Sequence, residues 1–215
     1  MLKTATPVSR SRLSSSAWIA MTVLAAIIAL YAALVFAGRI APPFVAELRR
    51  TVRWAVTAHL LGGFFALVLG PWQFNSRLRG RAIAVHRWMG RGYVVAVFTS
   101  GAAALVLAPR SQEGLVTHVG FGLLAALWLF STLRAYVAIR RREIVLHRRW
   151  MIRSFALTLA AVTLRVWLPL QLAAGIPFHD AYQVVAWLCW VPNLVVAEWI
   201  VLRVTSPTAP AAIPY

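Results

Sequence analysis

The sequence predicts an all-α membrane protein with six transmembrane helices. Of its 215 residues, 61% are hydrophobic and only 13% are charged, and the mean hydropathy is +0.74. This apolar share is well above that of soluble domains. Six apolar runs recur along the chain, and each is long enough to cross the hydrocarbon core of a bilayer as a helix.

The six expected helices cover residues 17–37, 54–74, 93–108, 115–137, 150–174 and 182–202. The first run follows basic residues, as a signal peptide would, but its apolar core is longer than that of a signal peptide and the cleavage site is weak. We therefore expect it to be retained. Residues 1–16 (Ser/Arg-rich) and 204–215 (Pro/Ala-rich) are expected to be disordered tails of one transmembrane domain, 17–203.

The net charge of +17 is better explained by orientation in the membrane than by nucleic-acid binding. If the N-terminus is cytoplasmic, sixteen Lys and Arg residues flank the inner ends of the helices and five flank the outer ends. Such an excess is typical of cytoplasmic loops, and it attracts anionic lipids of the inner leaflet. We expect both termini in the cytoplasm, with lipids and not nucleic acid as partners.

The second to fifth helices contain a weak internal repeat. Residues 57–63 (TAHLLGG) resemble 116–122 (VTHVGFG), and 86–91 (HRWMGR) resemble 147–153 (HRRWMIR). The two histidines of each unit are 27 and 29 residues apart. Helices two and three therefore form a unit that is repeated as helices four and five. We expect these four to form the core, with helices one and six outside it, and a site between the repeats.

Each of these four helices carries one histidine, and the expected topology sorts them by depth. His59 and His118 lie about 8 Å inside the outer boundary at about 1.5 Å per residue, and His86 and His147 lie near the inner headgroups. Ionisable residues are costly at membrane depth and mark functional sites. Two neutral imidazoles from facing helices can ligate a haem iron. We expect His59 with His118 to hold one haem b and His86 with His147 a second; the alternative is that each histidine hydrogen-bonds a neighbouring helix.

Glycines follow three of these histidines by one helical turn. Gly63, Gly90 and Gly122 stand four residues after His59, His86 and His118, and Met151 takes the fourth position. Small residues there leave room for the edge of a cofactor. Close packing of helices through small residues is the alternative explanation.

Several arginines are candidates for binding haem propionates, since guanidinium groups match carboxylates geometrically. The inner candidates also serve as ordinary membrane anchors; they are Arg87, Arg91, Arg148, Arg149 and Arg153. Arg165 lies deep in the fifth helix, where anchoring does not explain it, and is expected to bind an outer propionate or a quinone headgroup, or else backbone carbonyls or loop residues. Glu198 is expected to form a structural ion pair with Arg134 or Arg153. His179 is expected in a solvated outer turn.

Two resemblances follow from these residues. The segments 70–74 (GPWQF), 86–91 and 147–154 (HRRWMIRS) resemble a family of uncharacterised bacterial membrane proteins, which implies the bacterial inner membrane but no activity. The pattern of six helices with one histidine on each of the four central ones is similar to the di-haem cytochrome b561 family. In that family the second and fourth helices share one haem and the third and fifth share the other. The short loops and the lack of an ascorbate-site motif depart from it.

Together these observations predict a transmembrane di-haem b-type cytochrome, an electron-transfer oxidoreductase. It would pass electrons between a quinol or small reductant and an acceptor, and it could form a homo-oligomer. The single cysteine, Cys189, excludes a CxxCH haem attachment and a disulfide framework. The alternatives are a haem-free membrane protein that binds a lipid, quinone or transported solute, and a structural subunit of a membrane complex.

Overall fold

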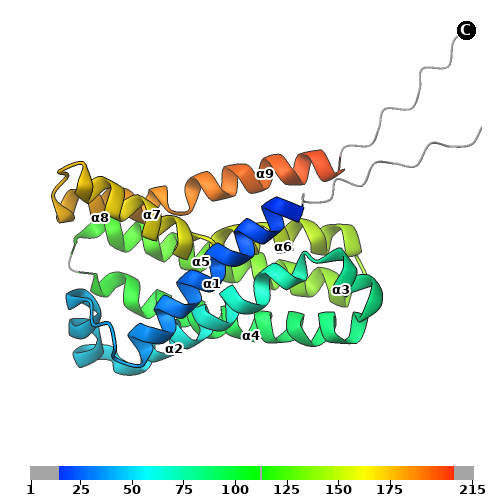
Figure 1. Cartoon of the computed structure of the whole chain (residues 1–215), viewed down its shortest axis with the longest axis horizontal. Coiled ribbons are helices and arrows are strands. Elements are labelled where there is room, and N and C mark those ends of the chain that lie inside the picture. The colour runs from blue at the N-terminus through cyan, green and yellow to red at the C-terminus, as the bar shows by residue number, and fades with distance from the viewer. Residues whose placement is uncertain (1–14, 112, 206–215) are drawn as a thin grey trace, which may run out of the picture.

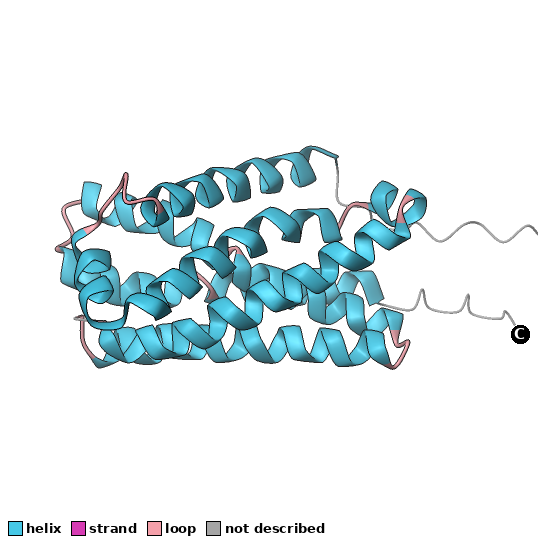
Figure 2. Ribbon diagram, turned by 90° about the horizontal axis from the view of Figure 1, so that it is seen from below, coloured by secondary structure: helices cyan, strands magenta, loops and turns pink. Residues whose placement is uncertain are grey.

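The computed structural model describes residues 15–111 and 113–205 and confirms the six-helix membrane bundle. All regular elements of these residues are helical, and six helical segments are long and apolar enough to span a membrane. The segments lie lengthwise in one bundle (Figures 1 and 2), so the chain is a multi-pass membrane protein. Residues 1–14 and 206–215, which make up most of the two predicted tails, lie outside the described residues.

The described part of the chain contains nine α-helices and one 3₁₀ turn, of which all but the short α3 belong to the six spans. The first two spans are α1 (Ser15–Phe36) and α2 (Pro43–Gln73), followed by the short α3 (Ser76–Arg81). The third and fourth are α4 (Ile83–Leu107), with the turn η1 (Ala108–Arg110), and α5 (Leu115–Arg140). The fifth consists of α6 (Ile144–Thr158) and α7 (Ala160–Ala173), and the sixth of α8 (Phe178–Leu188) and α9 (Val191–Thr205).

These bounds differ from the predicted ones mainly at the helix starts. α2, α4 and α6 begin earlier than the apolar runs, at Pro43, Ile83 and Ile144. Hydropathy detects only the part of a helix that lies in hydrocarbon, whereas the helical backbone continues into the headgroup region through charged residues such as Glu47 and Arg87. The breaks inside the fifth and sixth spans carry no strong sequence signal.

The predicted core of two helix pairs is present. α2 packs along α4, α4 packs on α5, and α5 packs on α6, while α1 covers α2 and α9 lies against α6. α1 begins and α9 ends at the same end of the bundle, which also carries α3 (Figure 1). We call this the terminal end; it corresponds to the predicted inner face. The opposite end carries η1 and the α7–α8 connection and corresponds to the predicted outer face.

Two glycines allow the helices of the core to approach closely. A Cβ on Gly62 would lie 2.6 Å from the carbonyl oxygen of Ala96 in α4, and a Cβ on Gly70 would lie 2.2 Å from the ring of Phe155 in α6. No side chain fits at either position. Small residues bring helices together in membranes in this way.

A buried hydroxyl network joins α4, α5 and α6 in the centre of the bundle. The hydroxyl of Tyr93, which is 0% exposed, lies 2.9 Å from Ser154 Oγ and 2.8 Å from Thr158 Oγ1. Trp128 Nε1 donates to Thr158 Oγ1 at 3.0 Å, and Thr132 Oγ1 lies 2.7 Å from Ser154 Oγ. Polar groups at membrane depth must find hydrogen-bond partners inside the protein. Here the side chains of three helices provide these partners for one another.

Side chains also satisfy the two helix breaks, which lie next to each other. The fifth span is interrupted at Leu159, and the sixth after Cys189. Asn193 Nδ2 donates to the carbonyls of Ala156 at 3.2 Å and Cys189 at 3.0 Å, and Thr163 Oγ1 also donates to Cys189. Freed carbonyls in transmembrane helices are commonly satisfied by neighbouring polar side chains.

Replacing Tyr93 by Phe should destabilise the bundle, because it removes a hydroxyl from a sealed network and leaves Ser154 and Thr158 short of a partner. We expect a loss of about 1 kcal/mol in free energy of unfolding, the scale of hydrogen bonds between membrane helices. Unfolding in mixed micelles measures it. The control is Tyr136→Phe, whose hydroxyl accepts a bond from Arg140 at the exposed surface. Equal effects of the two changes would contradict the special role of Tyr93.

Candidate functional site

The structure brings His86 and His147 together at the terminal end. Each is the fourth residue of its helix, since α4 begins at Ile83 and α6 at Ile144. His147 lies within electrostatic range of His86. Neither helix has a side-chain cap at its amino terminus, so free backbone N–H groups add positive potential at this end of the bundle.

The ring nitrogens of these two histidines differ in their partners. His147 Nδ1 lies 2.9 Å from the carbonyl oxygen of Ala135; a carbonyl only accepts, so Nδ1 carries the proton and Nε2 keeps its lone pair. His86 Nδ1 is buried without a partner, and so are Gln73 Nε2, Arg149 Nε and Trp150 Nε1. Within residues 15–111 and 113–205, these four are the buried side-chain atoms that lack a hydrogen-bond partner. All four belong to residues near the terminal end. Such atoms are rare in proteins and often indicate a missing ligand or water.

Positive charge surrounds the pair. Arg79 and Arg87 lie within electrostatic range of His86, and Arg148 lies within range of Arg79. Burial and the neighbouring Arg148 lower the pKa of Arg79. The ion pairs found in the described part of the chain involve none of these arginines. The site therefore favours an anionic group.

Arg153, also a predicted propionate partner, is engaged elsewhere. Its Nε and Nη2 donate to the two carboxylate oxygens of Glu198 at 2.6 and 2.7 Å, and its guanidinium lies 4.6 Å from the centre of the Trp150 ring. The predicted structural ion pair of Glu198 is thus confirmed, with Arg153 as the partner. We leave Arg153 out of the candidate site.

The structure does not bring His59 and His118 together. His59 Nδ1 lies 3.1 Å from the carbonyl oxygen of Ser100 in α4, whereas His118 Nε2 lies 2.6 Å from the carbonyl oxygen of Ser111, beyond η1. Ser100 and Ser111 are eleven residues apart, or about 16 Å along a helix. His59 therefore lies much deeper in the bundle than His118. The prediction of equal depth counted from charged residues, but α2 extends well beyond Arg53 while α5 begins only three residues before His118.

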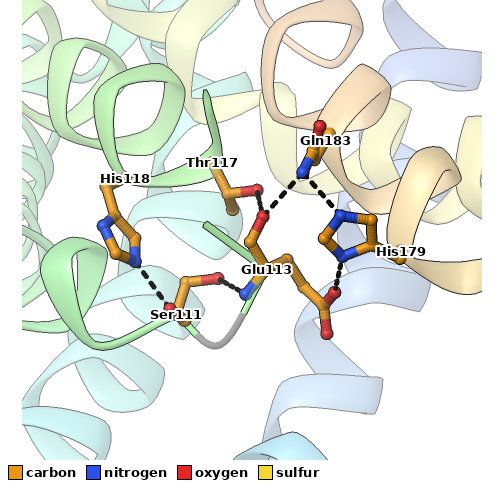
Figure 3. A network of polar contacts seen from close by, with 6 residues as sticks. All are labelled: Ser111, Glu113, Thr117, His118, His179 and Gln183. Carbon is orange, nitrogen blue, oxygen red and sulfur yellow. Dashed lines mark hydrogen bonds and ion pairs between the residues drawn. The ribbon is translucent and has the colours of Figure 1, made fainter. Parts of the chain in front are cut away.

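His118 belongs to a network at the opposite end (Figure 3). Ser111, its partner, also accepts a bond from the backbone N–H of Glu113. The Glu113 carboxylate lies 2.7 Å from Nδ1 of His179, and Gln183 donates to the Glu113 carbonyl at 3.0 Å. The network ties the start of α8 to the α4–α5 connection. His179 thus lies in the first turn of a helix and not in the predicted loop.

The glycines next to the histidines have different surroundings. A Cβ on Gly90 would lie 3.1 Å from Gln73 Oε1, so the amide of Gln73 fills the space beside it. A Cβ on Gly63 would meet Ser100 Oγ at 3.6 Å and one on Gly122 would meet only Ala108 at 4.0 Å, which are ordinary contacts. A Cβ would therefore fit beside Gly63 and Gly122 at ordinary contact distances, while Gly90 is packed more tightly against Gln73.

Three residues of this region were not predicted from the sequence as part of a site. The sequence marks Arg79 only as a basic loop residue, and it assigns no site role to Gln73 or Tyr93. An amide inside the apolar run 70–74 was the available signal for Gln73. The short helix α3 places Arg79 close to His86 and lets it donate to the Gln73 carbonyl at 3.0 Å, and no sequence pattern indicated this helix.

Comparison with known families agrees with the membrane fold. A family described as predicted membrane protein (DUF2306) matches residues 56–201. The chain belongs to this family. The match runs from α2 to α9 and includes all four core histidines. No curated protein and no solved structure matches the chain, and the similarity to cytochrome b561 gains no support from these comparisons.

Replacing Glu198 by Gln should lower the free energy of unfolding by about 1 kcal/mol, because a bidentate, half-exposed pair loses its charge. Thermal or chemical unfolding in detergent checks this. The matched control is Glu47→Gln, which breaks the exposed pair of Glu47 with Arg50 at 3.4 Å and should have no measurable effect. If both changes destabilise equally, the bidentate geometry contributes nothing of its own.

Proposed function

We propose that this membrane protein is a b-type cytochrome that holds one haem at the terminal end, between His86 and His147. The observation that carries the proposal is that two histidines at matching positions of parallel helices lie within electrostatic range and retain nitrogen atoms without a partner. Imidazoles from neighbouring helices are common axial ligands of haem.

The donor set of the terminal end fits this group. Metal-bound imidazoles usually donate their second N–H to a carbonyl or carboxylate, which is what His147 does to Ala135. The unpaired Nδ1 of His86 is consistent with a ligand that completes its surroundings. Arg79, Arg87 and Arg148 supply positive charge for the two propionates.

The residues of the chain would orient the group and exclude water from it. Tyr93 and Phe155 stand about two helical turns deeper than His86 and His147, are fully or almost fully buried, and close the site toward the membrane centre. When bound, haem supplies one-electron redox chemistry. The protein would then accept electrons from a quinol or a small reductant at the terminal face and transfer them to an acceptor.

A second haem between His59 and His118 is not part of this proposal. The carbonyls that the two histidines contact, those of Ser100 and Ser111, are about 16 Å apart along the helix direction, and His118 Nε2 is engaged by the Ser111 carbonyl. We therefore propose one haem for each chain, in place of the two expected from the sequence.

The experiment is a dithionite-reduced minus oxidised absorption spectrum of protein purified from haem-replete cells. We expect a b-type band with about one haem per chain, lost in both His86→Ala and His147→Ala, because each removes an axial ligand.

The matched controls are His59→Ala and His179→Ala, which should keep the full spectrum. A colourless wild-type protein would refute the proposal. Loss of haem in His59→Ala, with retention in His86→Ala, would move the site to the outer histidines.

A further inference from the structure

Arg165 lies in the half of the bundle away from the terminal end and makes no ion pair with the residues that the structure describes. It lies in α7, and its Nη1 donates to the carbonyl of Ala161, one turn back in the same helix, at 2.8 Å. Its guanidinium lies 4.7 Å from the centre of the Tyr31 ring in α1. Arg165 is eight residues from the end of α7, about 12 Å inside the span.

No Asp or Glu side chain of the described residues forms an ion pair with this arginine. The sequence holds five acidic residues, and all lie within the described residues. Three form ion pairs elsewhere, namely Glu47, Glu113 and Glu198. The other two lie at the amino termini of α6 and α8, namely Glu143 and Asp180. A charge at membrane depth is costly unless an anion or polar groups surround it. An anion from outside the chain is therefore favoured.

Polar groups of three other helices lie near Arg165. Tyr31 of α1 contacts it through its ring, and Tyr182 of α8 and His59 of α2 lie within its electrostatic range. The hydroxyls of both tyrosines and Nε2 of His59 make no hydrogen bond with the described residues, while His59 Nδ1 donates to the Ser100 carbonyl. None of these atoms is among the buried atoms without a hydrogen-bond partner, so a small group can reach them.

Arg165 lies outside the part of the fifth span that packs against the Tyr93 network. In this span α6 packs along α5, whereas α7, which carries Arg165, packs mainly on α8. A Cβ on Gly63, one turn from His59, would meet Ser100 Oγ at 3.6 Å, which is an ordinary contact.

We infer that this cluster binds the carboxylate head group of a membrane-borne amphiphile, such as a long-chain fatty acid. The planar guanidinium matches a carboxylate in a two-point contact, and the two phenol hydroxyls add donors. The depth of Arg165 means that the head group is drawn in from the bilayer while the acyl chain stays among lipids. The site involves neither His86 nor His147, so a negative result for the haem proposal would not affect this inference.

The test measures binding of radiolabelled oleate to the purified full-length protein in phosphatidylcholine nanodiscs, with oleyl alcohol as the uncharged probe. We expect saturable binding of oleate at about one per chain and weak binding of the alcohol. Arg165→Gln should weaken oleate binding by about 10-fold or more, the scale of a lost charge-assisted bond. Arg165→Lys should recover part of it, since it restores the charge without the planar fork.

Arg110→Gln is the matched control, because Arg110 also donates to a carbonyl four residues back in the chain, that of Val106, but on the exposed surface. It should bind oleate normally, and the haem spectrum should be the same in all these variants. If Arg165→Gln does not fold, Tyr31→Phe and Tyr182→Phe replace it, and each should weaken binding several-fold.

Three results would overturn the inference. The first is equal binding of oleate and oleyl alcohol. The second is unchanged oleate binding in the folded Arg165→Gln protein or in both tyrosine variants. The third is displacement of oleate by a short-chain quinone at a far lower concentration than by unlabelled oleate. The last result would assign the cluster to a carbonyl ligand.

Discussion

In a bilayer, every polar group of the chain must find its partner inside the protein, and the hydroxyl network around Tyr93 meets this requirement for the centre of the bundle. Tyr93 reaches from α4 to Ser154 and Thr158 of α6, and Trp128 of α5 closes the set. The close contacts of Gly62 and Gly70 hold α2 against the same helices. These contacts join the helices that carry His86 and His147, which lie within electrostatic range of each other at the terminal end.

The same requirement distinguishes structural polar groups from functional ones. Thr163, Asn193 and the Glu198–Arg153 pair are satisfied by other parts of the chain, which is sufficient to explain them. His86 keeps a buried ring nitrogen without a partner, and Arg165 donates to a carbonyl of its own helix but has no ion pair within the described residues. His86 lies at the cationic terminal end, and Arg165 lies in the other half of the bundle. The molecule therefore has two separate candidate sites.

The sequence was sufficient to predict the six spans, the repeated core, the multi-pass membrane fold and the ion pair of Glu198, because hydropathy and charge are local properties. It could not give the depths of His59 and His118, since these depend on where α2 and α5 begin outside the apolar runs and on the register between helices. It also missed α3, and with it the approach of Arg79 to His86. Whether any of the four histidines binds haem stays a prediction.

The most direct test is an electron-microscopy structure of the protein purified with its native lipids from haem-replete cells. The account predicts non-protein density against the ring nitrogens of His86 and His147, separate density against the guanidinium of Arg165, and none within the Tyr93 network. It would be contradicted by well-ordered side chains with no such density, in which His86 bonds to a group of the chain and Arg165 is paired with a protein carboxylate.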